Sequence, residues 1–281
     1  MAAVLVATLM ALGAAVLHAG WNLLVKQGGD DRFLLLWGQF FLAAVLCAPI
    51  VFGFGGLPWS SWKWVFLSGS VHLPYCVFLA KAYNEGDFSL VYPIARGGGA
   101  MLAAVGGVLF LSDHLSLMSA LGIAVVGGGL SLLAGPMGRA GMRSVAFALI
   151  VALTIGIYSV SDAKGIRSSG TARYALATHL GTAMSTSLFG LVTGQAREMQ
   201  RVMRTHWRRL ALVGLASTVT YTLVQLAFKR APVGYVTALR ESSVVLAAFI
   251  GWRRLGEPVG LRRVVSTGLV LAGLVTLVVG R

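Results

Sequence analysis

Residues 33–53 read FLLLWGQFFLAAVLCAPIVFG, a stretch without Asp, Glu, Lys or Arg. About 20 mostly apolar residues in a helix are enough to cross the hydrocarbon core of a bilayer. Nine further segments of the chain have a similar length and a similar apolar character. The ten predicted spans are 2–25, 33–53, 63–84, 88–111, 115–135, 143–164, 174–193, 208–229, 233–255 and 261–280. The short loops between them leave no room for a soluble domain, so the sequence predicts an all-α membrane protein with ten transmembrane helices.

Composition supports this fold class. Of the 281 residues, 57% are hydrophobic and only 11% are charged, and the mean hydropathy is +0.81. Soluble domains carry about 25% charged residues, so a soluble enzyme is excluded. Cys47 and Cys76 both lie in apolar stretches, which predicts neither a disulfide nor a zinc framework. The segment 2–25 is apolar with no Lys or Arg before it, and we expect a full span there rather than a cleavable signal peptide.

The charge of the chain is strongly positive, with 23 Lys and Arg against 9 Asp and Glu, a net charge of +14. In a soluble protein this excess would suggest a nucleic-acid partner. Membrane proteins, however, concentrate Lys and Arg in the short loops between spans, so we expect a lipid bilayer and no nucleic acid. The arginine-rich stretch 195–209 is a candidate interfacial helix.

The chain carries a weak internal repeat. The segment 158–162 (YSVSD) follows 18–22 (HAGWN) by 140 residues, and the fourth and ninth spans end similarly, in 111–113 (LSD) and 255–257 (LGE). Each half holds an odd number of spans, so a second copy must cross the membrane in the opposite direction. This predicts an inverted repeat, with the site near the membrane midplane between the halves. The two predicted repeats, which together form one transport domain, are residues 1–138 and 139–281.

Three short motifs carry a resemblance to a known family. They are 18–22 (HAGWN) in the first span, 92–97 (YPIARG) in the fourth and 239–243 (LRESS) in the ninth. With ten spans in about 280 residues, the whole chain resembles the EamA-type transporters of the drug/metabolite transporter superfamily. Ser112-Asp113 at the end of the fourth span departs from the Gly-Glu pair that is commoner in the family.

The resemblance implies a multi-pass carrier of a small-molecule substrate in the bacterial inner membrane. It implies a cavity lined by spans one to four and six to nine, with spans five and ten at the periphery. Family substrates range from amino acids and amines to sugar nucleotides, so the resemblance indicates a class of protein and not a ligand. It leaves the assembly open between a monomer and a homodimer.

Charged residues deep inside spans are the strongest functional candidates, because each is costly to insert into a bilayer. They are Arg96, Arg240 and Glu241. The repeat offset makes Arg96 the counterpart of Glu241, which predicts a charge gate across the cavity. Arg240 and Glu241 are about 100° apart on a helix, which leaves Arg240 to attract a carboxylate or phosphate. The alternative is that Arg96 and Glu241 form only a structural ion pair.

A second group lies on one face of the first span, where His18, Trp21 and Asn22 are spaced by three and four residues. Tyr158 and Asp162 repeat this geometry in the sixth span, which favours a cavity wall in both halves. The alternative is an interfacial Trp beside a packing Asn, with Asp162 simply solvated near the end of its span.

Further polar side chains in the third, fourth, eighth and ninth spans complete the predicted site. His72 follows the more frequent pattern of a hydrogen-bonded structural His, the tyrosines are suited to stacking on a ligand, and His179 is assigned no role. The predicted substrate-binding residues are His18, Trp21, Asn22, His72, Tyr75, Tyr92, Arg96, Tyr158, Asp162, Tyr221, Gln225, Arg240, Glu241 and Ser242. Arg96, Glu241 and His18 are the candidates for a charge gate or for coupling.

These residues predict a transporter and not an enzyme. No spacing of catalytic or metal-ligating residues stands out, and the glycine triplets 97–99 and 127–129 lack a phosphate-loop context. Without an ATPase motif and without a cofactor, transport must use a gradient or exchange, and coupling to protons is one possibility. The predicted function is secondary-active export of small zwitterionic or anionic metabolites, such as amino acids, by alternating access. Alternatives are efflux of amines or cationic drugs, a lipid-headgroup translocase, or a membrane-embedded subunit of a complex.

Orientation is left open by the sequence. The loops after odd-numbered spans, with their flanks, carry 14 Lys and Arg, against 7 in the other loops and the C-terminal tail. The positive-inside rule places the richer side in the cytoplasm and therefore both termini outside. The family resemblance implies cytoplasmic termini.

Overall fold

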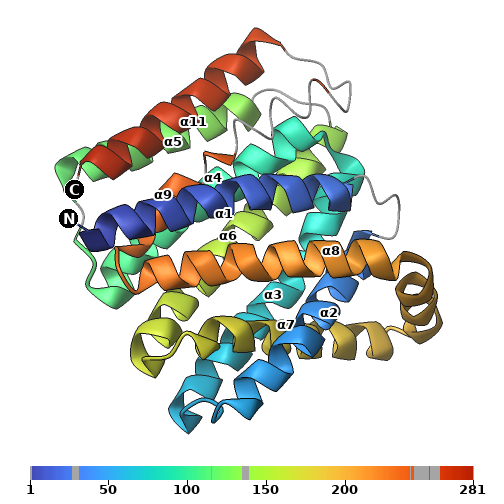
Figure 1. Cartoon of the computed structure of the whole chain (residues 1–281). Helices are drawn as coiled ribbons and strands as arrows, with labels where there is room; N and C mark the ends of the chain where they lie inside the picture. The colour runs from blue at the N-terminus through green and yellow to red at the C-terminus, as the bar shows by residue number, and fades with distance from the viewer. Residues whose placement is uncertain are drawn as a thin grey trace.

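The computed structural model describes residues 2–26, 32–114, 116–134, 139–240, 242–243, 253 and 260–280. Regular secondary structure in this part of the chain is helical throughout (Figure 1). The helices are α1 (Ala2–Lys26), α2 (Arg32–Gly53), α3 (Trp59–Glu85), α4 (Phe88–Leu111), α5 (Leu117–Ala134), α6 (Arg139–Ser169), α7 (Arg173–Val192), α8 (Ala196–Phe228), α9 (Val233–Arg240) and α11 (Leu261–Val279). Within the described residues, α1 to α4 and α6 to α8 are long and apolar enough to cross a membrane, which confirms a multi-pass helical membrane protein.

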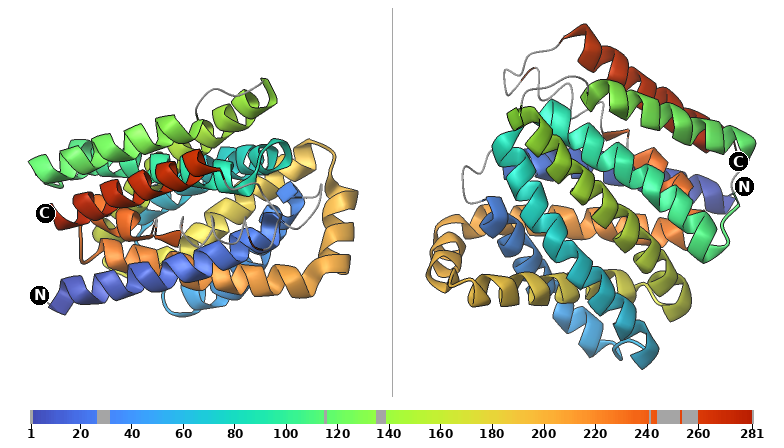
Figure 2. Two further views of the ribbon diagram at one scale, coloured as in Figure 1. Left: turned by 90° about the horizontal axis from the view of Figure 1, so that it is seen from above. Right: turned by 180° about the vertical axis from the view of Figure 1, so that it is seen from behind.

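Two helices run further than the sequence suggested. α6 continues to Ser169, beyond the span predicted at 143–164. The candidate interfacial helix at 195–209 is not separate, because the structure joins this stretch to the following span in the single helix α8. Figures 1 and 2 show that α8 bends, so that its arginine-rich first turns run across the direction of the span that follows. In the ninth predicted span, 233–255, the structure describes the continuous helix α9 from Val233 to Arg240.

The two halves of the chain interlock rather than forming separate bodies. α2 packs on α7, α1 on α8, α4 on α9, and α6 on both α3 and α4. Small residues allow the closest crossings, since interfaces between membrane helices depend on close backbone approach. At the α3–α7 crossing, a Cβ added to Gly69 would lie 2.3 Å from the carbonyl carbon of Gly181.

α5 and α11 form a pair at one edge of the molecule, and both views in Figure 2 show them side by side. A Cβ on Gly273 of α11 would lie 2.7 Å from the Gly122 carbonyl oxygen of α5, so this pair also depends on glycine. The outer faces of the pair are apolar and exposed, for example at Leu121 and Val264. This is the peripheral position that the family resemblance implied for spans five and ten.

Polar contacts tie the helix ends together on both sides of the bundle. At the end away from the termini, Arg263 pairs with Asp87, and Arg143 lies 3.5 Å from Glu85. At the end that carries both termini (Figure 1), Arg167 lies 3.1 Å from Asp113. Asp113 also accepts a hydrogen bond from the Val233 backbone N–H at 2.9 Å, which joins α4, α6 and the start of α9.

Candidate functional site

A small polar cavity lies in the middle of the bundle, where seven helices meet. Its lining residues are His18, Trp21, Phe40, His72, Tyr75, Tyr158, His179, Ser217, Thr220, Tyr221 and Arg240. The cavity volume is about 20 Å³, which is room for about one water molecule. The structure is therefore closed around these side chains, and a metabolite can enter only if the helices move apart.

Arg240, the last residue of α9, supplies the positive charge of this cavity. Its side chain is 1% exposed, and it forms no ion pair with any described residue. Its Nε has no acceptor in that part of the chain. A buried charge without a partner is expensive, and this one lies on a cavity wall. That combination is typical of a group that binds a ligand.

Other nitrogen atoms of the cavity wall share this lack of a partner. The Trp21 indole N–H donates to no described residue, and His18 Nε2 and His179 Nε2 likewise have no partner there. His18 and Trp21 meet edge to face, with ring centroids 4.7 Å apart. An indole N–H can only donate, so Trp21 and Arg240 both present donors that suit an anionic oxygen.

Aromatic rings form the rest of the wall around His72. His72 stacks on Tyr158, with centroids 4.2 Å apart and planes 24° apart, and meets Tyr221 edge-on at 5.7 Å. His72 Nδ1 donates to the Ser68 carbonyl oxygen at 2.8 Å, which leaves Nε2 as an acceptor when the ring is neutral. The rings provide a surface that can hold an apolar or cationic part of a ligand.

Several predicted site residues hold the helices together and do not line the cavity. Asn22 donates to the His18 carbonyl oxygen at 2.9 Å and accepts from the Tyr83 hydroxyl at 3.2 Å. The Tyr92 hydroxyl donates to Ser243 at 2.9 Å. Gln225 donates to the Thr178 hydroxyl at 3.2 Å, which ties α8 to α7.

Asp162 lies behind the cavity wall and is fully buried. The Tyr221 hydroxyl donates to its carboxylate from the cavity side, and the Tyr174 hydroxyl lies 3.3 Å from it. The alternative of a solvated Asp162 is therefore wrong. The reason is the length of α6, which continues to Ser169 and places Asp162 about 10 Å from the helix end.

The remaining predicted residues are Arg96, Ser242 and Glu241. Arg96 is buried in α4, 4% exposed. Ser242 is half-buried and donates its backbone N–H to the Leu239 carbonyl oxygen at 3.2 Å. Glu241 lies outside the described residues, so the predicted Arg96–Glu241 gate, and coupling through Glu241, stay predictions.

The chain is similar to known proteins in sequence and in fold. Residues 142–279 match the EamA-like transporter family. This match places the second half of the chain in the EamA-like transporter family. A solved structure, described only as the crystal structure of a protein, has a similar fold, with a TM-score of 0.69 over 96% of this chain and 95% of that chain at 16% identity. No curated protein matches the chain.

The cavity of this EamA-like transporter includes residues that the sequence analysis missed. They are Phe40, His179, Ser217 and Thr220. His179 is a titratable residue inside a span, and that signal alone justified a role. Ser217 and Thr220 share a helix face with Tyr221 by their spacing of three and four. Phe40 carries no such signal, because it is one apolar residue in the charge-free span 33–53.

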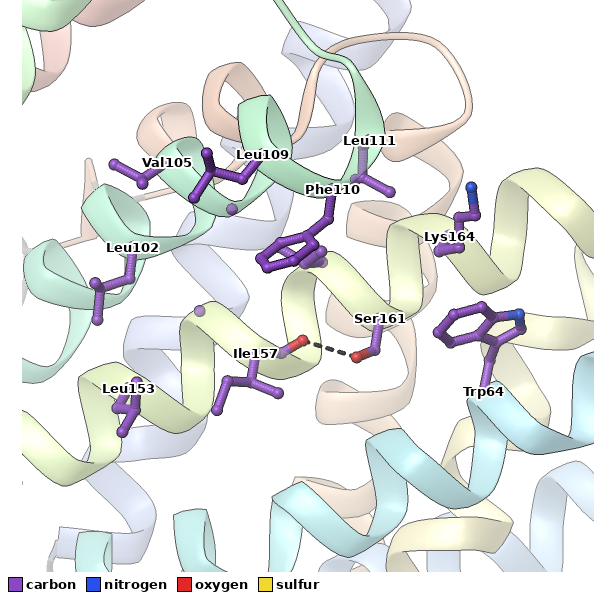
Figure 3. A pocket seen from close by; sticks show the side chains of 13 residues that line it. Trp64, Leu102, Val105, Leu109, Phe110, Leu111, Leu153, Ile157, Ser161 and Lys164 are labelled. Carbon is purple, nitrogen blue, oxygen red and sulfur yellow. Dashed lines mark hydrogen bonds between the residues drawn. The ribbon is translucent and has the colours of Figure 1, made fainter.

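A larger hollow than the central cavity is an apolar groove of about 550 Å³ between α4 and α6 (Figure 3). Leu109 and Phe110 on its wall are 69% and 72% exposed. The hydroxyl of Ser161 in the groove donates to the Ile157 carbonyl oxygen at 2.9 Å within α6. Such a lining suits hydrocarbon and offers little to a polar metabolite, so the central cavity remains the candidate site.

Proposed function

We propose that this protein is a secondary-active exporter of small zwitterionic or anionic metabolites, such as amino acids, in the inner membrane of a bacterium. The observation that carries this proposal is the buried Arg240, whose Nε lacks an acceptor among the described residues and which lines the central cavity together with the Trp21 indole. A carboxylate has the lone pairs to accept from both donors. The adjacent His72, Tyr158 and Tyr221 rings would contact the rest of the molecule.

Alternating access is supported by the way the halves pack. In an inverted repeat, each helix of the first half has a counterpart at the same place in the second half, so that α1 corresponds to α6 and α3 to α8. The contact between α1 and α8 then corresponds to the contact between α6 and α3, and the structure has both contacts. The same correspondence converts α2–α8 into α7–α3 and leaves the α2–α7, α4–α9 and α5–α11 pairs unchanged. This pattern supports an inverted repeat of residues 1–138 and 139–281, with the cavity between the repeats. The family match, which covers residues 142–279, supports a repeat boundary at the same place.

The closed cavity implies two gates. The Asp113–Arg167 contact closes the end near the termini, and the Asp87–Arg263 contact closes the other end. In this proposal each contact releases in turn, so that the cavity is open to only one side at a time.

The test of the substrate class is ligand-induced stabilisation, since a ligand that binds only the folded protein raises its Tm. Purified protein receives either a mixture of the standard L-amino acids or a mixture of phenethylamine and cadaverine, which lack the carboxylate. We expect the amino acids alone to raise Tm. Arg240→Ala should raise the half-saturating concentration by about tenfold or more, the equivalent of at least ~1.4 kcal/mol.

Arg230→Ala is the matched control. Arg230 is exposed just beyond α8 and donates to the Leu226 carbonyl oxygen in the last turn of that helix, so its loss should leave the response unchanged. Equal responses of the Arg240→Ala variant and the wild type would overturn the role of Arg240.

Efflux of amines or cationic drugs is the second candidate. The observation in its favour is the ring cluster, in which His72 lies 5.8 Å from Tyr75 and 5.7 Å from Tyr221 between centroids, because aromatic faces attract cations. Stabilisation by the amine mixture alone would favour this function.

A further inference from the structure

Asp162 is a buried acid that substrate recognition by Arg240 does not use. Its carboxylate is fully buried in α6, and it forms no ion pair with any described residue. Its hydrogen-bonding partners are the hydroxyls of Ser68 on α3, Tyr174 on α7 and Tyr221 on α8. An ionised carboxylate at membrane depth without a cation beside it is costly, so this position calls for an explanation beyond packing.

The partners of Asp162 accommodate both forms of a carboxyl group. A hydroxyl can donate a hydrogen bond to a carboxylate, and it can equally accept one from a protonated carboxyl. Neither form of Asp162 is therefore left with an unsatisfied polar atom.

Asp113 shows the contrasting arrangement in the same molecule. Its partners are the Arg167 guanidinium at 3.1 Å and the Val233 backbone N–H at 2.9 Å. Both groups are donors that cannot accept. The partners of Asp113 are therefore donors only, whereas the hydroxyl partners of Asp162 can donate or accept.

Tyr221 connects Asp162 to the cavity. Its hydroxyl contacts the carboxylate, and its ring lines the cavity beside His72 and His179, at 5.7 and 5.9 Å between centroids. Gain or loss of a proton at Asp162 would therefore affect the cavity wall through the side chain of Tyr221. The titratable and charged groups that face the Asp162–Tyr221 pair are His72 of α3, Tyr158 of α6, Tyr174 and His179 of α7 and Arg240 of α9.

We propose that Asp162 binds the proton that drives export, an inference that rests on the proposed transport function. The Asp162 carboxylate takes one proton from water on the side to which the bundle is open, forming an O–H bond, and the Tyr221 hydroxyl turns from donor to acceptor. When the bundle opens to the other side, that O–H bond breaks and the proton returns to water. Export driven by proton entry requires the two ligands to alternate, so substrate binding releases the proton.

The first experiment needs no substrate. Infrared spectra of the purified full-length protein are recorded across a pH titration in H₂O and in D₂O. We expect a protonated-carboxyl band that shifts in D₂O, disappears in Asp162→Asn and persists in Asp113→Asn. Tyr221→Phe, which removes one hydroxyl partner and keeps the acid, should move the midpoint at which the band appears. A titrating carboxyl band that is identical in the wild type and in the Asp162→Asn and Tyr221→Phe variants would overturn the proposal.

The second experiment links the proton to transport. The mixture of standard L-amino acids is added to weakly buffered protein with a pH-indicator dye. Wild type should release protons on binding, and Asp162→Asn should lose this release. The same release from both proteins, or proton uptake, would overturn coupling through Asp162. If the amino acids do not bind at all, the proposed substrate class fails, and the infrared result still decides whether Asp162 is a proton site.

Discussion

At Trp21, a role in ligand binding can be distinguished from a role in packing by removing one group, the indole N–H. Trp21 lines the cavity, and its indole N–H has no acceptor in the described part of the chain. Trp21→Phe removes the donor and keeps an aromatic ring. If the substrate carboxylate accepts from this N–H, the variant should bind the amino acid mixture about 5- to 30-fold more weakly, as expected for ~1–2 kcal/mol. The half-saturating concentration in the thermal-shift assay measures this.

The same substitution at Trp59, which is 86% exposed, serves as the control and should change neither binding nor stability. Without ligand, Trp21→Phe should be at least as stable as the wild type, because it removes an unsatisfied buried donor. Unchanged affinity in Trp21→Phe would show that Trp21 only packs.

Between whole helices, the α3–α7 crossing depends on Gly181. A Cβ at this position would lie 2.5 Å from the Val65 carbonyl oxygen, and the Ser185 hydroxyl of the same helix donates to the Gly69 carbonyl oxygen at 2.6 Å. Gly181→Ala should separate the helices, weaken this hydrogen bond and destabilise the protein by ~1–3 kcal/mol, as overpacking does. The Tm of purified protein measures the loss.

Gly128 of α5 is the comparison, since nothing lies within 4 Å of a Cβ added there. Gly128→Ala should leave Tm unchanged or raise it slightly, because alanine favours a helix. Equal effects at the two glycines would refute a close-packed α3–α7 crossing.

For the whole molecule, Arg167 holds one end of the bundle closed. It contacts Asp113 at 3.1 Å and donates to the carbonyl oxygens of Phe228 at 3.1 Å and Ala231 at 3.4 Å, so it joins α4 and α6 to the connection between α8 and α9. Arg167→Gln should increase the population open at this end. A cysteine introduced at cavity residue Thr220 should then react several-fold faster with a membrane-impermeant maleimide added from that side.

Arg230→Gln in the same Thr220→Cys background is the control, because Arg230 is exposed just beyond α8 and its side chain donates to the Leu226 carbonyl oxygen in the last turn of α8. Its labelling rate should match that of the parent. A slower or unchanged rate in Arg167→Gln would contradict a gate at this end.

The predicted and observed helices agree best where the local sequence alone determines where the helix begins and ends. The span predicted at 88–111 matches α4, and that at 33–53 differs from α2 by one residue. The polar stretch 195–209 is helical as predicted from Ala196 onward, and it continues into the following span as one helix, α8. Its interfacial position stays a prediction. For Asp162, sequence spacing identified the residue, but its burial depends on Tyr174 and Tyr221 from two other helices.

Trp21 and Asn22 illustrate the division between local and tertiary information. The free energy of transferring an apolar segment into lipid is a sum over its residues. The sequence alone therefore indicated the spans, the membrane and the charges that must be buried. It also placed Trp21 and Asn22 on one helix face, yet the structure directs Trp21 into the cavity and Asn22 to Tyr83 of α3. Only the tertiary structure selected Arg240, Trp21 and His179 as a convergent set, because convergence depends on packing between helices far apart in the chain, and no local pattern encodes that packing.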